Sequence, residues 1–157
     1  MASRGNNSGR IASNRRALHD YFVLERFEAG IELRGTEVKS IRDGHISLAG
    51  SFGRIEDGDV VLFGVNVTPY EFGNRFNHPA DRPRRLLLHK REIRKIKAHL
   101  EQKGQALVPL AVYLKRGLIK VEVGLCKGKQ NYDKRESVRR KEMDREAARA
   151  RAHSGRR

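Results

Sequence analysis

The chain has one cysteine, no tryptophan and four prolines. A single thiol, Cys126, forms neither an internal disulfide nor a cysteine-based zinc site, which fits a reducing compartment. No segment approaches the roughly 20 consecutive apolar residues that a membrane helix needs. Residues 1–8 carry no apolar signal region and no myristoylation pattern. We therefore expect a soluble, cytoplasmic protein without a membrane partner.

Recognisable catalytic patterns are also missing. None of the six histidines pairs with another at the i, i+4 spacing of a zinc-hydrolase helix. There is no Gly-x-Ser-x-Gly elbow, no P-loop and no dinucleotide fingerprint. Cys126 ends an alternating apolar segment, where packing is the simpler interpretation. The sequence thus predicts no enzyme, metal or cofactor, although a catalytic set assembled from distant residues stays open.

Aromatic residues are few, with six Phe and four Tyr, and most fall in a core-like alternation. Proteins that bind single-stranded nucleic acid generally expose several rings on one sheet face. If the partner is RNA, the pattern therefore favours recognition of the shape and backbone of a folded RNA.

Positive charge is what the chain has in excess. It carries 34 Lys and Arg against 19 Asp and Glu, a formal net charge of +15. Such a charge repels itself in the folded state and favours an anionic partner, first of all nucleic-acid phosphates. An anionic membrane is the weaker alternative because it requires an anchor. Charge runs are often only solvated surface, but here the net charge favours phosphate contact.

The chain divides into three parts by composition. Residues 1–13 are small, polar and basic, and we expect disorder there. Residues 14–128 carry the apolar periodicity of one folded domain. Residues 129–157 form a basic tail with little apolar content. Such a segment buries too little surface to offset its ordering entropy, so we expect disorder in the free protein and helix formation once a partner neutralises its charge.

Period-two alternation predicts several strands. The clearest are 118–125 and 107–114, joined by a hairpin turn at 115–117. Two further strands are expected at 20–27 and 30–34, joined by a tight turn at 28–30. Another is expected at 51–55, and a turn at 56–59 leads from it into a central strand at 60–68. Short strands with glycine-bearing turns favour a small barrel.

Two helices are predicted among these strands. Thr36 is placed to cap a helix over 37–43, with Lys39 and Arg42 forming a small basic face. A longer basic helix, which includes Lys90, is expected over 89–103 and ends before a glycine.

Glu28 is an acid in a basic chain. A carboxylate near RNA is repelled by phosphate but accepts hydrogen bonds from base edges or a 2′-hydroxyl. Taken alone, Glu28 is an ordinary turn acid.

An ordered set of motifs resembles the SmpB family of SsrA-binding proteins, which partner transfer-messenger RNA in bacterial ribosome rescue. The motifs are Asn14-Arg15-Arg16-Ala17-Leu18-His19-Asp20-Tyr21, Phe27-Glu28-Ala29-Gly30-Ile31, Gly35-Thr36-Glu37-Val38-Lys39-Ser40-Ile41-Arg42, Arg85-Leu86-Leu87-Leu88, and Lys127-Gly128-Lys129 followed by Asp133-Lys134-Arg135. Each is weak alone, but the ordered set is highly specific.

The resemblance implies a mainly β fold: a six-stranded antiparallel OB-like barrel with about three helices and a basic tail. It implies binding to the tRNA-like domain of transfer-messenger RNA, where the protein stands in for a missing anticodon arm. It also implies delivery to stalled ribosomes for trans-translation, with the tail in the mRNA channel and decoding centre. We expect a monomer in the bacterial cytoplasm.

The resemblance also implies site residues. Asn14, Glu28 and Leu87 match positions implicated in RNA binding. The further residues predicted to bind RNA are Arg15, Arg16, His19, Lys39, Arg42, Arg84, Arg85 and Lys90. In the tail, the matching positions are Lys127, Lys129, Tyr132, Asp133, Lys134 and Arg135. Tyr132 stands where many members have His, Gln130 where many have Lys, and Leu18 where Arg is common.

Two other functions stay open. A structural ribosomal protein would co-sediment stoichiometrically with all ribosomes, and a ribonuclease would turn over labelled RNA.

Overall fold

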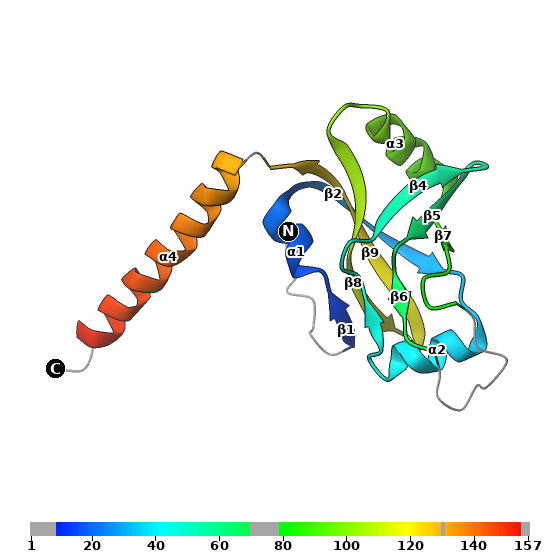
Figure 1. Cartoon of the computed structure of the whole chain (residues 1–157), viewed down its shortest axis with the longest axis horizontal. Coiled ribbons are helices and arrows are strands. Elements are labelled where there is room, and N and C mark those ends of the chain that lie inside the picture. Colours follow the sequence, from blue (N-terminus) through cyan, green and yellow to red (C-terminus); the bar gives the residue numbers. More distant parts are fainter. Residues whose placement is uncertain (1–8, 70–78, 130, 155–157) are drawn as a thin grey trace.

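A computed structural model describes residues 9–69, 79–129 and 131–154 (Figure 1). The elements in chain order are β1 (Arg10–Ser13), α1 (Arg15–Asp20), β2 (Tyr21–Ile31), α2 (Gly35–Arg42), β3 (Ile46–Ser47), β4 (Phe52–Glu56), β5 (Asp59–Phe63), β6 (Asn66–Val67), β7 (Arg84–Leu87), α3 (Lys90–Leu100), β8 (Gln105–Lys115), β9 (Leu118–Gly128) and α4 (Asn131–Ser154).

Seven of these strands form one antiparallel sheet in the order β1-β8-β4-β5-β7-β2-β9. Because β9 also pairs with β8, six of them close into a ring. β1 is outside the ring and pairs with β8 at residues 111–113, beyond the point where β4 meets β8 at Leu107. β3 and β6 form a separate two-stranded sheet. The predicted mainly β, antiparallel architecture is confirmed, and the closed ring has six strands.

The interior of the ring is aliphatic. Alternate residues of its strands point inward, so that Val60 and Leu62 on β5 meet Leu107 on β8 and Val123 on β9, all 0–1% exposed. Ile96 anchors α3 to this core and is fully buried. Burial of this many branched side chains supplies the main stabilisation of the domain.

The ring is closed on one side by the contact between β4 and β8. The pairing between these strands rests on Gly53 opposite Leu107. A Cβ at Gly53 would lie 2.7 Å from Leu107 Cδ2. The close approach of the two strands therefore requires glycine on β4.

Two hairpin turns agree with the prediction. Asp57 and Gly58 join β4 to β5 with φ of 49° and 79°, and Arg116 and Gly117 join β8 to β9 with φ of 51° and 76°. Two successive positive φ values match the twist of two-residue hairpins.

The prediction of two strands separated by a turn at 28–30 is wrong. β2 runs without interruption and pairs with β9 from Tyr21 opposite Gly128 to Gly30 opposite Lys120. Gly30 is needed for lateral contact rather than for a turn, because a Cβ there would lie 3.2 Å from Leu87 Cβ. The predicted central strand at 60–68 is instead divided at Gly64, which has a φ of 79°.

Other boundaries also differ from the prediction. Residues 10–13 are ordered as β1 because their backbone pairs with β8. The sequence did not predict α1. The helix α2 begins after Arg34, not at a Thr36 cap, and α3 ends at Leu100 rather than near 103.

Cys126 is fully buried on β9, as predicted, and its Sγ donates to the Gly124 carbonyl at 3.4 Å. Burial raises the pKa of the thiol to about 11. The thiol is therefore protonated at neutral pH and chemically quiet.

The helix α4 extends away from the ring (Figure 1). Its two large apolar side chains with described surroundings, Val138 and Met143, are 41% and 62% exposed. None of the described helices is long and apolar enough to cross a bilayer. Disorder of the tail in the free protein stays a prediction.

Candidate nucleic-acid interface

The predicted RNA-binding residues gather mainly at the two ends of β2. Asn14, Arg15, Arg16 and His19 lie on or before α1, which leads directly into β2; we call this the α1 surface. Glu28 lies on the outside of the ring near the far end of β2, and Leu87 lies beside it on β7.

Asn14 is buried, with 5% exposed, and all its polar groups are used within the protein. Its Oδ1 accepts a hydrogen bond from the Ala17 N–H at 3.2 Å and caps α1. Its Nδ2 donates to the carbonyls of Leu48 and Pro109 at 3.3 and 3.0 Å. In the structure, Asn14 therefore fixes α1 to β8, and its role in RNA binding stays a prediction.

The short helix held by Asn14 presents its charges outward. Arg15 and Arg16 are exposed. Asp20 lies 3.8 Å from the Arg16 Nε, and its Oδ1 is 2.9 Å from the His19 Nδ1. Asp20 thus orients two of the basic side chains at one end of β2.

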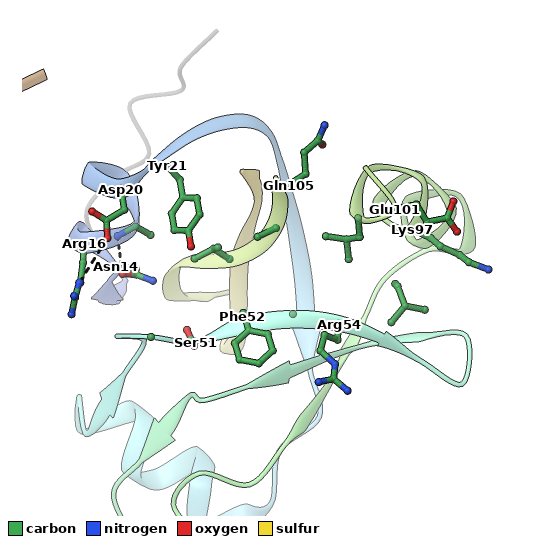
Figure 2. Close-up of a pocket in the computed structure, with 17 residues that line it drawn as sticks. Asn14, Arg16, Asp20, Tyr21, Ser51, Phe52, Arg54, Lys97, Glu101 and Gln105 are labelled. Atoms are coloured by element: carbon green, nitrogen blue, oxygen red, sulfur yellow. Dashed lines mark hydrogen bonds and ion pairs between the residues drawn. The ribbon is translucent and has the colours of Figure 1, made fainter. Parts of the chain in front are cut away.

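A hollow of about 770 Å³ lies beside the α1 surface, between α1, β4, α3 and β8. In Figure 2 the ring of Tyr21 reaches into this space, whereas the charged ends of Arg16 and Lys97 extend away from it. Much of its wall is apolar, formed by side chains such as Ala17, Leu100 and Val108. The cations therefore flank the hollow instead of lining an anion site.

The Glu28 carboxylate on β2 accepts hydrogen bonds from two side chains of β8, which lies two strands away in the sheet. Its Oε2 accepts a hydrogen bond from the Tyr113 hydroxyl on β8 at 2.5 Å. Lys115, also on β8, donates to Oε1 at 3.1 Å and to Oε2 at 3.3 Å. The Tyr113 hydrogen bond, together with Lys115 and Lys120, holds the pKa of Glu28 below its ordinary value. Glu28 is accordingly a fixed, ionised acceptor on the outer face.

Leu87 is the neighbouring apolar residue, and 53% of it is exposed. It pairs with Gly30 on β2, and Gly30 pairs with Lys120 on β9. Because Gly30 has no side chain, the Leu87 side chain packs against the Gly30 backbone on the outer face of the sheet. Leu87 also lines a hollow on this face together with Arg85 and Lys120. We call the outer surface formed by Glu28, Leu87, Arg85, Tyr113, Lys115 and Lys120 the β2–β7 face.

Arg85 lies on the same side of β7 as Leu87 and is exposed. Its Nε donates to Glu32 at 2.9 Å and its Nη1 to Asp59 at 3.4 Å. The hydrogen bond to Glu32 and then that to Asp59 raise the pKa of the guanidinium above its ordinary value. Arg85 is thus a fixed cation available to solvent.

Arg84, also predicted to bind RNA, is buried, with 1% exposed, and its role in RNA binding stays a prediction. Its guanidinium contacts Glu37 Oε2 at 2.6–2.7 Å and donates to the carbonyls of Val65 and Ala80. Burial alone would raise the pKa of Glu37, but hydrogen bonds, the largest from Arg82, outweigh it and lower the pKa. This buried pair fastens α2 to β7.

The remaining predicted cations of the domain are exposed but dispersed. Arg42 donates to the Gly117 carbonyl at 3.1 Å. The basic face of α2, which consists of Lys39 and Arg42, therefore lies beside the tip of the β8–β9 hairpin. Lys90 starts α3 just after β7.

The sequence reasoning missed Tyr113, Lys115 and Lys120. The hairpin turn at 116–117 fixes their register, with Tyr113 opposite Lys120, so the turn and the alternation together contained that information. Their distance to Glu28 depends on β2 pairing with β9, which is a tertiary fact. The structure also exposes Phe52, whose ring stacks on that of Phe63 at 5.8 Å between ring centroids.

The tail positions begin where β9 ends. Lys127 is exposed, and the Lys129 ammonium lies 4.9 Å above the centre of the Phe22 ring. Tyr132, Asp133, Lys134 and Arg135 fall in the first turns of α4, and their side chains lie outside the described part of the structure. Gln130 also lies outside the described residues.

Comparison with known proteins gives consistent matches. Residues 11–153 match the family model described as SmpB protein. The SsrA-binding protein of Shouchella clausii (strain KSM-K16) is 54% identical over 140 residues, which cover 89% of this chain and 90% of that protein. That of Geobacter sulfurreducens is 52% identical over 140 residues, covering 89% and 92%. A solved structure described as "tmRNA-SmpB: a journey to the center of the bacterial ribosome" matches with a TM-score of 0.66 at 50% identity, covering 82% of this chain and 94% of that one.

Proposed function

The chain belongs to the SmpB protein family, and on that premise we propose that it binds transfer-messenger RNA and delivers it to stalled ribosomes for trans-translation. The relatives are named as binders of SsrA RNA, and the matched structure concerns transfer-messenger RNA with SmpB on the bacterial ribosome. The net charge of +15 suits a partner built of phosphates.

The observation that carries the RNA-binding proposal is the meeting of Glu28 and Leu87. These residues are 59 positions apart, yet they lie on one outer face, linked through Gly30, which follows Glu28 by two on β2 and pairs with Leu87. An exposed leucine and an ionised acid surrounded by Arg85, Lys115 and Lys120 fit a folded RNA, because cations bind phosphates while the acid selects hydrogen-bond donors.

We assign the six-stranded ring to an OB-like barrel that binds the tRNA-like domain, with residues 14–128 as the binding unit. β1, formed just before it, extends the sheet by one strand. The α1 surface supplies a second set of phosphate contacts through Arg15, Arg16 and His19, and Lys39, Arg42 and Lys90 add to the field around the ring.

The tail, residues 129–157, is assigned to the mRNA channel and decoding centre. The helix α4 is exposed and lacks a described apolar face, which suits binding by charge to ribosomal RNA rather than packing on the ring. Tyr132, Asp133, Lys134 and Arg135 occupy its first turns, nearest the ring. The protein acts as a monomeric adaptor in the bacterial cytoplasm and not as an enzyme.

Co-purification tests the proposal. The full chain is purified from its own cells and the RNA bound to it is sequenced. One dominant structured RNA with a tRNA-like end is expected. Stoichiometric co-sedimentation with all ribosomes would instead indicate a structural ribosomal protein, and cleavage of labelled RNA would indicate a ribonuclease.

A further inference from the structure

The most constrained polar group on the outside of the ring is the Glu28 carboxylate. Glu28 projects from β2, and the intervening strand β9 separates it from its partners Tyr113 and Lys115 on β8. Side chains of β2 and β8 therefore form one hydrogen-bonded cluster across β9, beside Leu87. An exposed ion pair adds little to folding stability, so stability alone gives a weak reason for such a cluster.

We propose that Tyr113 and Lys115 are positioning residues that orient Glu28 so that one acceptor position accepts a hydrogen bond from a 2′-hydroxyl or a base amino group of the bound RNA. This inference rests on the proposed function, because it requires the β2–β7 face to bind RNA. It adds two residues to the RNA site and assigns the chemistry that Glu28 selects.

The number of acceptor positions carries the argument. An ionised carboxylate offers about four lone-pair positions, two on each oxygen. Tyr113 and Lys115 occupy both positions on Oε2, and Lys115 occupies one on Oε1. Among the described residues no further donor reaches Oε1, which leaves one acceptor position on that oxygen, and 40% of the Glu28 side chain is exposed to solvent.

A single open acceptor discriminates between RNA groups. Phosphate has no hydrogen to donate and is repelled by the carboxylate, whereas a hydroxyl or amino group supplies one directed hydrogen bond. The open acceptor of Glu28 thus selects a neutral hydrogen-bond donor. The ammonium groups of Lys115 and Lys120 bind the phosphates that adjoin that donor.

The surrounding charges keep the acceptor ionised. Tyr113 and Lys115 face Glu28 from β8, and Lys120 and Glu122 face it from β9. The negative charge of Glu122 is offset by Arg26, whose Nη1 is its hydrogen-bond partner. The donated Tyr113 hydrogen bond is the largest influence on the Glu28 pKa and lowers it.

The test is a double-mutant cycle on RNA affinity. The full-length protein and the variants E28Q, Y113F, E28Q/Y113F and K115M are titrated into a transcript of the tRNA-like domain, with K103M as a control for removing one exposed cation. E28Q is expected to weaken binding about tenfold or more, because it alters a charge-assisted hydrogen bond. Y113F is expected to weaken it about three- to tenfold, and the double variant no further than E28Q.

A pH series separates positioning from mere structure. Removal of the Tyr113 hydroxyl lets the Glu28 pKa rise toward its ordinary value. The loss of affinity on acidification should therefore begin at a higher pH in Y113F than in the wild-type chain. Titration of histidines and RNA bases is common to both proteins and cancels in the comparison.

Each outcome is decisive. If the wild-type chain does not bind the transcript, the proposed function fails. If it binds and E28Q weakens binding, but Y113F and K115M bind like K103M, the positioning role is wrong. Additive losses in the double variant would likewise overturn it. Melting temperatures identify any variant that fails to fold, and K115M then tests the same cluster without Y113F.

Discussion

The ring and the tail helix α4 represent two different ways of using charge. In the ring, a cation such as Arg84 is fixed by a buried carboxylate and backbone carbonyls, and adjacent Arg85 is fixed at the surface by Glu32 and Asp59. In α4, Val138 and Met143 are exposed and the helix extends from the ring (Figure 1). The ring thus contains the buried core and the buried ion pair that stabilise it, whereas neither of these two apolar side chains of α4 is buried, and we predict that the tail needs a partner to offset its charge.

Deletion of the tail is the most severe way to separate the two regions. Truncation after Lys129 should abolish tagging on stalled ribosomes, because α4 is removed, yet leave affinity for the isolated RNA within about twofold. A reconstituted stalled-translation assay and a gel shift measure the two effects. Replacement of Asp133, Lys134 and Arg135 by alanine should likewise abolish tagging. Normal tagging by the truncated chain would reduce the tail to a solvated charge run.

Breaking the buried pair tests whether the ring stabilises itself. Arg84→Met leaves Glu37 buried with only one of its two arginine partners, Arg82, and should cost about 3–5 kcal/mol in the free energy of unfolding. Arg85→Met, one residue away, removes only solvent-exposed ion pairs and should change the free energy of unfolding far less. Urea denaturation monitored by circular dichroism measures both. Equal losses from the two substitutions would contradict the distinction between buried and exposed cations.

The same pair predicts a pH dependence. The Glu37 pKa is lower in the folded chain than its ordinary value of 4.5. Its contribution to stability is therefore complete above about pH 4.5 and is lost as the pH falls through the lower folded value. Melting curves between about pH 3 and 6 should show a smaller acid-induced decrease in Arg84→Met than in the wild-type chain. An unchanged decrease would show that other carboxyl groups dominate.

A smaller loss of stability is expected where β4 meets β8. Gly53→Ala places a Cβ 2.7 Å from the buried Leu107 Cδ2 and should cost about 1–3 kcal/mol through overpacking. Gly35→Ala is the matched control, because a Cβ there meets nothing within 4 Å. Chemical denaturation compares the two. A neutral Gly53→Ala would show that β4 and β8 separate without cost.

The smallest effect concerns the α1 surface. Replacing Arg15 and Arg16 by Gln should weaken RNA binding without changing the melting temperature. The slope of log K against log salt should fall by about 0.7–0.9 for each phosphate that the variant no longer neutralises. Filter binding from low to moderate salt measures the slope. Asn14→Ala, in contrast, should lower stability, because it removes the cap of α1.

Short-range chemistry specifies the local structure, and that structure could be predicted from the sequence. Alternation placed β8 and β9, and the turn residues at 57–58 and 116–117 placed their hairpins, because side-chain period and positive φ are properties of neighbouring residues. The ordered motifs identified the family, and the charge balance indicated an anionic partner. Burial of Cys126 also followed from its strand pattern.

In contrast, the exposure of individual side chains and the contacts between residues distant in the sequence depend on the tertiary structure. Arg84 and Arg85 are the same residue type at adjacent positions of β7, yet Arg84 points inward and Arg85 points outward. Arg84 is buried because Glu37, which is distant in the sequence, lies beside it, whereas Arg85 pairs with Glu32 at the surface. Asn14 matched an RNA-binding position but is buried as a cap. The Glu28 cluster needs β2, β9 and β8 to be neighbours, and its hydrogen bond from Lys115 joins residues 87 positions apart. Long-range pairing depends on the closure of the whole ring around its core, and no local pattern encodes that closure.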